Sequence, residues 1–142
     1  MDLKDCLEQR HLIKIEPDKN LTKKELDEAA YDLESAENTF KNEDYKWCII
    51  KAYYSMFHAA CAVLFKLGYQ EKKHFAIIVV LEDLSKKGKL ESNYVDYFNA
   101  AMSSREDADY HYVHSKEIAE NNMAIAEEFL ERMTQITKIA LA

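Results

Sequence analysis

Apolar residues recur at steps of three and four along most of the chain, which is the spacing of amphipathic α-helices. The strongest example covers residues 47–67, a stretch that is apolar on nearly every side. Such a helix belongs either at the centre of a bundle or in a membrane, and this one is long enough to cross a bilayer. However, Lys51, Ser55 and His58 interrupt it, and acidic segments flank it. We therefore expect the buried central helix of a soluble bundle, and no membrane partner.

Four other segments carry helical patterns. The first begins at Thr22, which fits a capping box with Glu25, and continues to about residue 41. In residues 75–87 the run AIIVVL suits a strand or a helix equally. We favour a helix, because a lone strand in a helical domain would have no partner. The last two helices are expected to begin near residue 91 or 92 and at Ser115.

Boundary signals support these helices. Asp44 is suited to cap the central helix, and Gly68 and Gly88 stand where left-handed residues close helix ends. Residues 1–21 are expected to form a charged N-terminal extension with a short amphipathic helix that includes Leu12 and ends before Pro17. The tail to residue 142 is expected to fray. The pattern predicts an all-α fold, a four- to five-helix up-and-down bundle in residues 22–142.

Composition agrees with a helical domain, because the 142 residues include only two glycines and one proline. The net charge of −7 argues against a protein that coats nucleic acid, although a small basic site stays open. Three cysteines without metal-ligand spacing indicate reduced thiols in a cytoplasmic protein. The N-terminus has no long apolar run after basic residues, so we do not expect a signal peptide.

Arg105 is the most unusual residue in the pattern, because it falls within the apolar stripe of the fourth helix, which we expect to continue to Tyr112. An unpaired buried charge is very costly, so Arg105 needs a partner. Asp109 lies one helical turn further on and suits that role. Two interpretations stay open. Arg105 and Asp109 form a structural ion pair, or the guanidinium binds a phosphate through two hydrogen bonds.

The histidines offer acid–base chemistry more readily than metal binding. His111 and His114 are one turn apart if the helix continues, but no further ligand has the right spacing, so we predict no metal site or cofactor. His111 suits a general acid or base, and the alternative is a surface histidine near a helix end. His58 is interpreted as a packed, hydrogen-bonded core residue. His74, beside Lys73, either starts a helix or borders a small basic patch.

The remaining polar and aromatic residues leave two questions open. Asp107 and Asp109 lie two positions apart and so on different faces of a helix, which argues against a catalytic carboxylate pair. Four tyrosines of the expected fourth helix either stack bases or pack a core or a dimer seam. They are Tyr94, Tyr97, Tyr110 and Tyr112.

Three phrases, taken in order and spacing, resemble the HEPN-domain family of small stand-alone prokaryotic proteins over residues 22–136. They are KAYYSMFHAACAVL at 51–64, KKHFAII at 72–78 and SREDADYHYVHSKEIAENNMAIAEEFLERM at 104–133. The resemblance implies a four- or five-helix bundle that is usually a homodimer. It also implies toxin–antitoxin pairing with a minimal nucleotidyltransferase.

The same resemblance implies a metal-independent endoribonuclease built on an arginine, four to six residues and a histidine. Arg105 and His111 enclose five residues. By analogy, His111 acts as general base or acid on the ribose, while Arg105 holds the phosphate, and the product is a 2′,3′-cyclic phosphate. In the family, the Arg–His motifs of the two subunits meet across the dimer interface. The expected nucleotide- or RNA-binding residues are Arg105, Asp109, Tyr112, His74 and Lys73.

A second hypothesis is a catalytically silent module that dimerises and binds the nucleotidyltransferase. Acidic residues next to the motif favour it, because Glu106, Asp107 and Asp109 repel phosphate. Geometry adds a condition to the first hypothesis. On an unbroken helix, Arg105 and His111 would be about 9 Å apart along the axis and about 120° apart around it. For Arg105 and His111 to act in one site, the helix must break near residue 110, or a partner subunit must supply one of the two residues.

Overall fold

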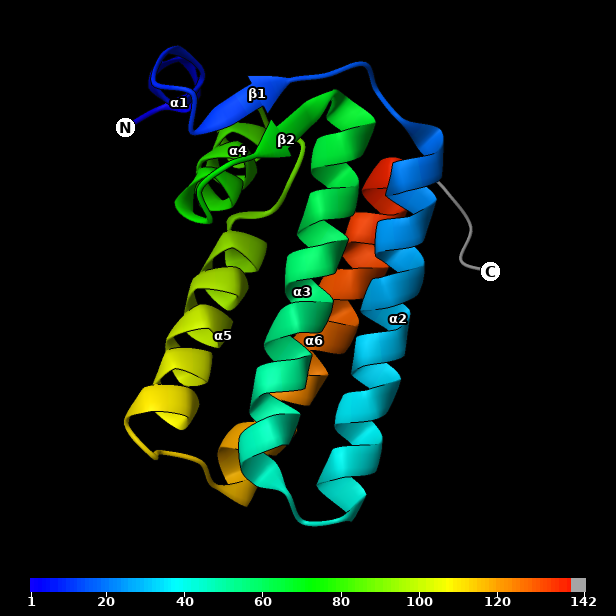
Figure 1. Cartoon of the computed structure of the whole chain (residues 1–142), viewed down its shortest axis with the longest axis vertical. Helices are drawn as coiled ribbons and strands as arrows, with labels where there is room; N and C mark the ends of the chain where they lie inside the picture. The colour runs from blue at the N-terminus through cyan, green and yellow to red at the C-terminus, as the bar shows by residue number, and fades with distance from the viewer. Residues whose placement is uncertain (139–142) are drawn as a thin grey trace.

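The computed structural model describes residues 1–138 and shows an all-α bundle with one small sheet. The long helices are α2 (Lys19–Lys41), α3 (Tyr45–Leu67), α5 (Ser92–Tyr110) and α6 (Lys116–Thr137). The shorter elements are α1 (Leu3–Glu8), β1 (Leu12–Lys14), β2 (Tyr69–Glu71) and α4 (Phe75–Lys86). In Figure 1, α3 runs through the middle, with α2 and α5 on either side and α6 behind it. The predicted fold class is confirmed. The expected fraying concerns residues 139–142, which lie outside the described residues.

Helix α3 is the core of the bundle, as its apolar pattern predicts. It is long and apolar enough to cross a membrane, but 72% of its most apolar window is buried inside the fold. That burial is typical of the central helix of a soluble domain. Its small residues let α2 approach closely, and the buried Ser55 hydroxyl donates a hydrogen bond of 2.8 Å to the carbonyl of Ala29. This bond ties α2 to α3 at the centre of the core.

Several helix ends follow the predicted signals. The Asp44 side chain caps α3 by accepting a hydrogen bond from the amide of Trp47, and α3 closes at Gly68, which has a φ of 88°. Ser115 caps α6 by accepting from the amide of Ile118. Gly88 follows α4 with a φ of 73°. These ends depend on local chemistry, which explains why the sequence predicts them.

The start of α2 differs from the prediction. The helix begins at Lys19, because the Asp18 side chain accepts a hydrogen bond from the amide of Leu21 and caps it. Thr22 therefore lies inside the first turn, where its hydroxyl donates to the carbonyl of Asp18. Asp is as good a helix cap as Thr, and the predicted capping box does not form. The carboxylate of Glu25 is free to reach α3 instead.

The N-terminal residues make a strand that the sequence analysis did not predict. β1 pairs antiparallel with β2, with Leu12 opposite Glu71. Leu12, which the sequence analysis expects in a short helix, lies in β1 instead. Figure 1 shows this sheet across one end of the bundle, beside α1 and α4. Cys6 and Leu12 are fully buried, so the N-terminal residues share the core of the bundle.

The three cysteines are free, buried thiols, as the sequence analysis expects. Cys48 and Cys61 lie in α3, and Cys6 lies in α1. Burial raises the pKa of Cys48 to about 11, because the thiolate would lose its hydration. These thiols are therefore packing residues of low nucleophilicity at neutral pH.

Helix α5 ends one residue before the motif histidine. Tyr110 is its last residue and His111 is the cap residue. Tyr112 adopts a left-handed backbone with a φ of 60°, and the amide of Val113 donates to the carbonyl of Asp107. The expected helical spacing of His111 and His114 is therefore wrong, because both lie beyond the helix. The break near residue 110 that one site requires is present.

Candidate ribonuclease site

Arg105 projects from α5 into an aromatic box formed mostly by α3. Its guanidinium carbon lies 6.0, 5.8 and 5.6 Å from the ring centroids of Tyr53, Tyr54 and Tyr110. Nη2 donates to the hydroxyl of Tyr54 at 3.4 Å and lies 3.5 Å from Oδ2 of Asp109. The rings hold the planar guanidinium through cation–π contacts. The expected ion pair with Asp109 is present, although it is only one of several contacts.

The electrostatics of the box keep Arg105 charged. Burial by itself would lower the pKa of Arg105, but Tyr54, Tyr110 and Asp109 together raise it above its usual value. Its side chain is 22% exposed. Within residues 1–138, Nε of Arg105 is the buried side-chain polar atom that has no hydrogen-bond partner. A buried unsatisfied donor costs about 1–3 kcal/mol, so this N–H is a donor that an anionic ligand can satisfy.

The pKa of Tyr53 is raised to about 12, mainly by burial and to a smaller extent by the neighbouring Tyr54. This ring is therefore a neutral phenol at physiological pH. A neutral phenol adds no negative charge to the box. The carboxylate of Asp109 is thus the anion that directly contacts the guanidinium in this part of the chain. An incoming phosphate would compete with this carboxylate for Nη2.

His111 pairs with a carboxylate of its own. Its Nδ1 lies 3.1 Å from Oδ1 of Asp107, one helical turn earlier. The His111 side chain is 67% exposed. A carboxylate that accepts from one ring nitrogen fixes the tautomer and leaves the other nitrogen available for proton transfer. The arrangement can therefore present Nε2 of His111 to a substrate as a base or an acid.

The two motif residues form separate half-sites in one chain. Arg105 contacts the tyrosines and Asp109, whereas His111 contacts Asp107. Between residues 1 and 138 no hydrogen bond or ion pair joins Arg105 to His111. Asp107 and Asp109 extend from different faces of α5. In a single chain, the guanidinium of Arg105 and the imidazole of His111 thus belong to two separate groups of side chains.

Of the other residues expected to bind RNA or nucleotide, Tyr112 adjoins His111, whereas within residues 1–138 no hydrogen bond or ion pair joins His74 or Lys73 to either half-site. Tyr112 follows His111 and is 78% exposed. The ring of His74, which precedes α4, lies 5.0 Å from that of Phe57, and Phe57 lies 6.1 Å from Tyr54. His74 therefore lies along the same face of α3 as the box, two rings away from the guanidinium. Lys73 is exposed beside it.

Sequence reasoning missed Tyr53, Tyr54 and Asp107. The two tyrosines belong to apolar stripes of α3, and nothing near them in the chain shows that α5 will place an arginine there. Asp107 precedes His111 by four positions, which is the spacing of helical side-chain neighbours. That spacing is the signal in the sequence from which the contact of Asp107 with His111 could have been predicted.

Comparisons with known proteins identify the family of this chain. The family model of the HEPN domain matches residues 22–136, which is most of the chain. A protein of Methanocaldococcus jannaschii named "Putative toxin" is 30% identical over 86 residues, and the match covers 60% of this chain and 58% of that protein. A UPF0332 protein of Archaeoglobus fulgidus is 29% identical over 102 residues, covering 70% of this chain and 82% of that protein. The matched family model establishes that this chain belongs to the HEPN-domain family.

Proposed function

We propose that this HEPN-domain protein is a metal-independent endoribonuclease that acts as the toxin of a toxin–antitoxin pair. The observation that carries the proposal is the exposed imidazole of His111. It follows the last residue of α5, the helix that carries Arg105, and contacts the carboxylate of Asp107. The name of the Methanocaldococcus relative supports a toxin role. A minimal nucleotidyltransferase is the proposed antitoxin partner.

Arg105 is proposed to bind the scissile phosphate. Its ion pair with Asp109, at 3.5 Å, is longer than the 2.7–2.9 Å of strong charge-assisted hydrogen bonds. A phosphate oxygen that approaches the guanidinium can therefore compete with the Asp109 carboxylate. It would also satisfy the buried Nε–H. The tyrosines fix the plane of the guanidinium, so little conformational freedom would be lost on binding.

His111 is proposed to move the proton. Nε2 accepts the proton of a ribose 2′-hydroxyl while the 2′-oxygen attacks the adjacent phosphorus. The bond from phosphorus to the 5′-oxygen breaks, and that oxygen takes a proton from a water molecule to become a hydroxyl, while the protonated His111 returns its proton to the solvent. The products are a 2′,3′-cyclic phosphate and a 5′-hydroxyl end. Arg105 stabilises the negative charge that develops on the phosphate oxygens.

The complete site is proposed to form across a homodimer. Among residues 1–138 of one chain, no side chain contacts both the guanidinium and the imidazole, so a second copy would bring His111 to the Arg105 box. The segment around His111 carries apolar surface that a second copy would cover. Tyr110, Tyr112 and Val113 are 62%, 78% and 47% exposed. Exposed apolar residues grouped in this way often mark an interface.

A silent interaction module is the second candidate, and a specific observation favours it. Asp109 already pairs with Arg105, and the neighbouring Glu106 and Asp107 add negative charge where RNA phosphates would lie. In this alternative the Arg105 box is a structural support, and the protein acts by dimerising and binding its nucleotidyltransferase partner.

The test is RNA cleavage by the full chain in EDTA, with wild type, His111→Ala, Arg105→Lys and the control His114→Ala. His114 is exposed in the same connection, so His114→Ala controls for the general loss of a surface imidazole. We expect cyclic-phosphate products from wild type and His114→Ala, and a loss of at least about 100-fold in His111→Ala. Arg105→Lys should lose activity because ammonium cannot bind phosphate bidentately. Equal cleavage by wild type and His111→Ala, or none by the folded protein, would favour the silent module.

A further inference from the structure

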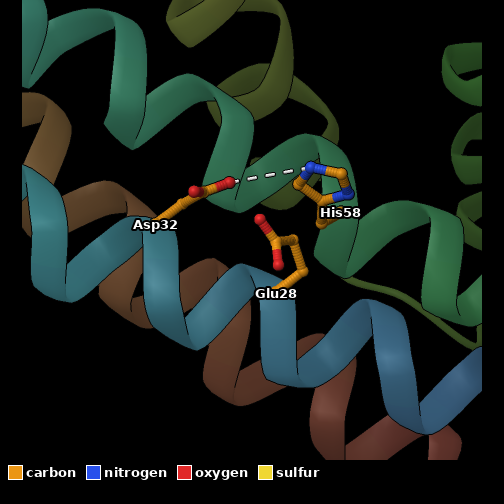
Figure 2. Close-up of side chains that lie close together, drawn as sticks. All are labelled: Glu28, Asp32 and His58. Carbon is orange, nitrogen blue, oxygen red and sulfur yellow. Dashed lines mark ion pairs between the residues drawn. The ribbon is translucent and has the colours of Figure 1, made fainter.

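A group of charged side chains joins α2 to α3 away from the Arg105 box. Glu25, Glu28 and Asp32 lie at positions i, i+3 and i+7 of α2, so their carboxylates share one stripe. His58 faces that stripe from α3. Figure 2 shows Glu28, Asp32 and His58 directed toward one another between the two helices. One ligand atom from each of these three lies within 4.8 Å of the others.

The imidazole of His58 is held in the orientation that metal-binding histidines adopt. Its Nδ1 lies 2.6 Å from Oε2 of Glu25, so that nitrogen is occupied. Its Nε2 faces Oδ2 of Asp32 at 3.6 Å. Histidine ligands in metal sites characteristically donate the second ring N–H to a carboxylate, which fixes the ring and its tautomer. Glu25 supplies that contact here.

The separation between His58 and Asp32 also fits a shared cation. At 3.6 Å, Nε2 and Oδ2 are too far apart for a hydrogen bond. Two ligand atoms bound to one tetrahedral ion at about 2.0–2.2 Å are roughly 3.4 Å apart. The side chains of Asp32 and His58 are 18% and 25% exposed, so water screens the Asp32 carboxylate only partly, whereas Glu28 is exposed. A cation between them would offset the repulsion between Asp32 and Glu28.

We propose that Glu28, Asp32 and His58 bind one divalent transition-metal ion, Zn²⁺ or Mn²⁺, with Glu25 as the positioning residue for the imidazole. One nitrogen and two carboxylate ligands suit such ions, whereas Ca²⁺ prefers oxygen alone. Three protein ligands leave coordination positions for water. The ion clamps α2 to α3, and His58 follows Tyr54 of the Arg105 box by one turn of α3. RNA cleavage is proposed to need no metal, so this inference and the proposed function stand or fall separately.

The test is calorimetric titration of the metal-stripped full chain with ZnCl₂ and MnCl₂ at about pH 8, because a metal ion binds the neutral imidazole and the hydrogen bond to Glu25 raises the pKa of His58. Wild type should bind one ion per chain. Asp32→Asn and Glu28→Gln should weaken binding at least tenfold, and Glu25→Gln about 10- to 100-fold through the lost anchor of the imidazole. Glu37→Gln is the matched control, because Glu37 is an exposed carboxylate of α2 outside the cluster. It should bind as wild type does.

Two further measurements keep the outcome clear. Circular dichroism of each variant without metal shows whether it is folded, and a melt with saturating metal should raise the wild-type melting temperature by several degrees and that of Asp32→Asn much less. Absence of binding to wild type would overturn the proposal and leave an ion-pair network around His58. Unchanged affinity in folded Asp32→Asn would also overturn it. The proposal would also be overturned if Ca²⁺ bound as tightly as Zn²⁺ and if Ca²⁺ binding persisted in His58→Gln.

Discussion

Replacement of Arg105 by alanine should lower stability measurably, whether or not Arg105 also acts in catalysis. The substitution removes cation–π contacts with three rings, each worth about 0.5–1 kcal/mol at a partly exposed site. It also removes an ion pair with Asp109 worth about 0.5–1 kcal/mol after allowance for solvent. It relieves the buried, unsatisfied Nε–H, which returns about 1–2 kcal/mol, the lower part of the usual range because the side chain is 22% exposed. The free energy of unfolding should therefore fall by about 1–2 kcal/mol.

The assay is urea unfolding followed by circular dichroism at one fixed protein concentration, because a dimer would make stability depend on concentration. A double-mutant cycle with Asp109→Asn isolates the ion pair, and the coupling energy should be about 0.5–1 kcal/mol. Arg105→Lys is the matched variant that keeps a charge near Asp109 but loses the planar stacking. It should fall between wild type and Arg105→Ala.

Two results would refute this reasoning. If Arg105→Ala is as stable as wild type, the aromatic box contributes nothing and Arg105 is available for function alone. If the loss exceeds about 4 kcal/mol, the side chain has a buried structural role that its contacts do not account for. A coupling energy near zero would show that Asp109 is free to leave Arg105 when an anion binds.

Two other predictions concern the core. Ser55→Ala should cost about 1 kcal/mol in urea unfolding, because the carbonyl of Ala29 loses its buried hydroxyl donor; an unchanged midpoint would show that the bond does not hold α2 to α3. Gly68→Ala should cost about 2–4 kcal/mol, because φ is +88° and the new Cβ would lie 2.9 Å from the carbonyl oxygen of Ile15. Gly88→Ala is its control, since φ is +73° but the space is open, and it should cost only about 1–2 kcal/mol. Equal losses at the two glycines would contradict the close approach.

Sequence signals of short range predicted much of the fold. Asp44, Gly68 and Ser115 end or begin helices through hydrogen bonds or backbone conformations within a few residues, and each was predicted. The β1–β2 pair was not predicted, because its strands are far apart in sequence and too short to show alternation. The end of α5 at Tyr110 was not predicted, because no glycine or proline marks it. Tyr112 takes the left-handed conformation that glycine often takes at a helix end.

The candidate sites divide in the same way. The Arg105–Asp109 contact follows from spacing along one helix, so the sequence predicts it. The contact of Arg105 with Tyr54 and that of His58 with Glu25 each join two helices. Their formation depends on how α3 packs against its neighbours, which periodicity alone does not specify. His58 was accordingly interpreted as a core residue, and its carboxylate neighbours were not predicted.

A subunit-mixing experiment on RNA cleavage in EDTA tests the proposed composite site most directly. Arg105→Lys and His111→Ala are each expected to be inactive alone. If the site joins Arg105 of one copy to His111 of the other, each mixed dimer carries one intact site. An equal mixture that exchanges freely should then recover about a quarter of wild-type activity, because half the dimers are mixed and each has one of two sites. Mass spectrometry of differently tagged copies would confirm the exchange. Recovery near that level supports a composite ribonuclease site, whereas no recovery from exchanged, folded dimers would contradict it.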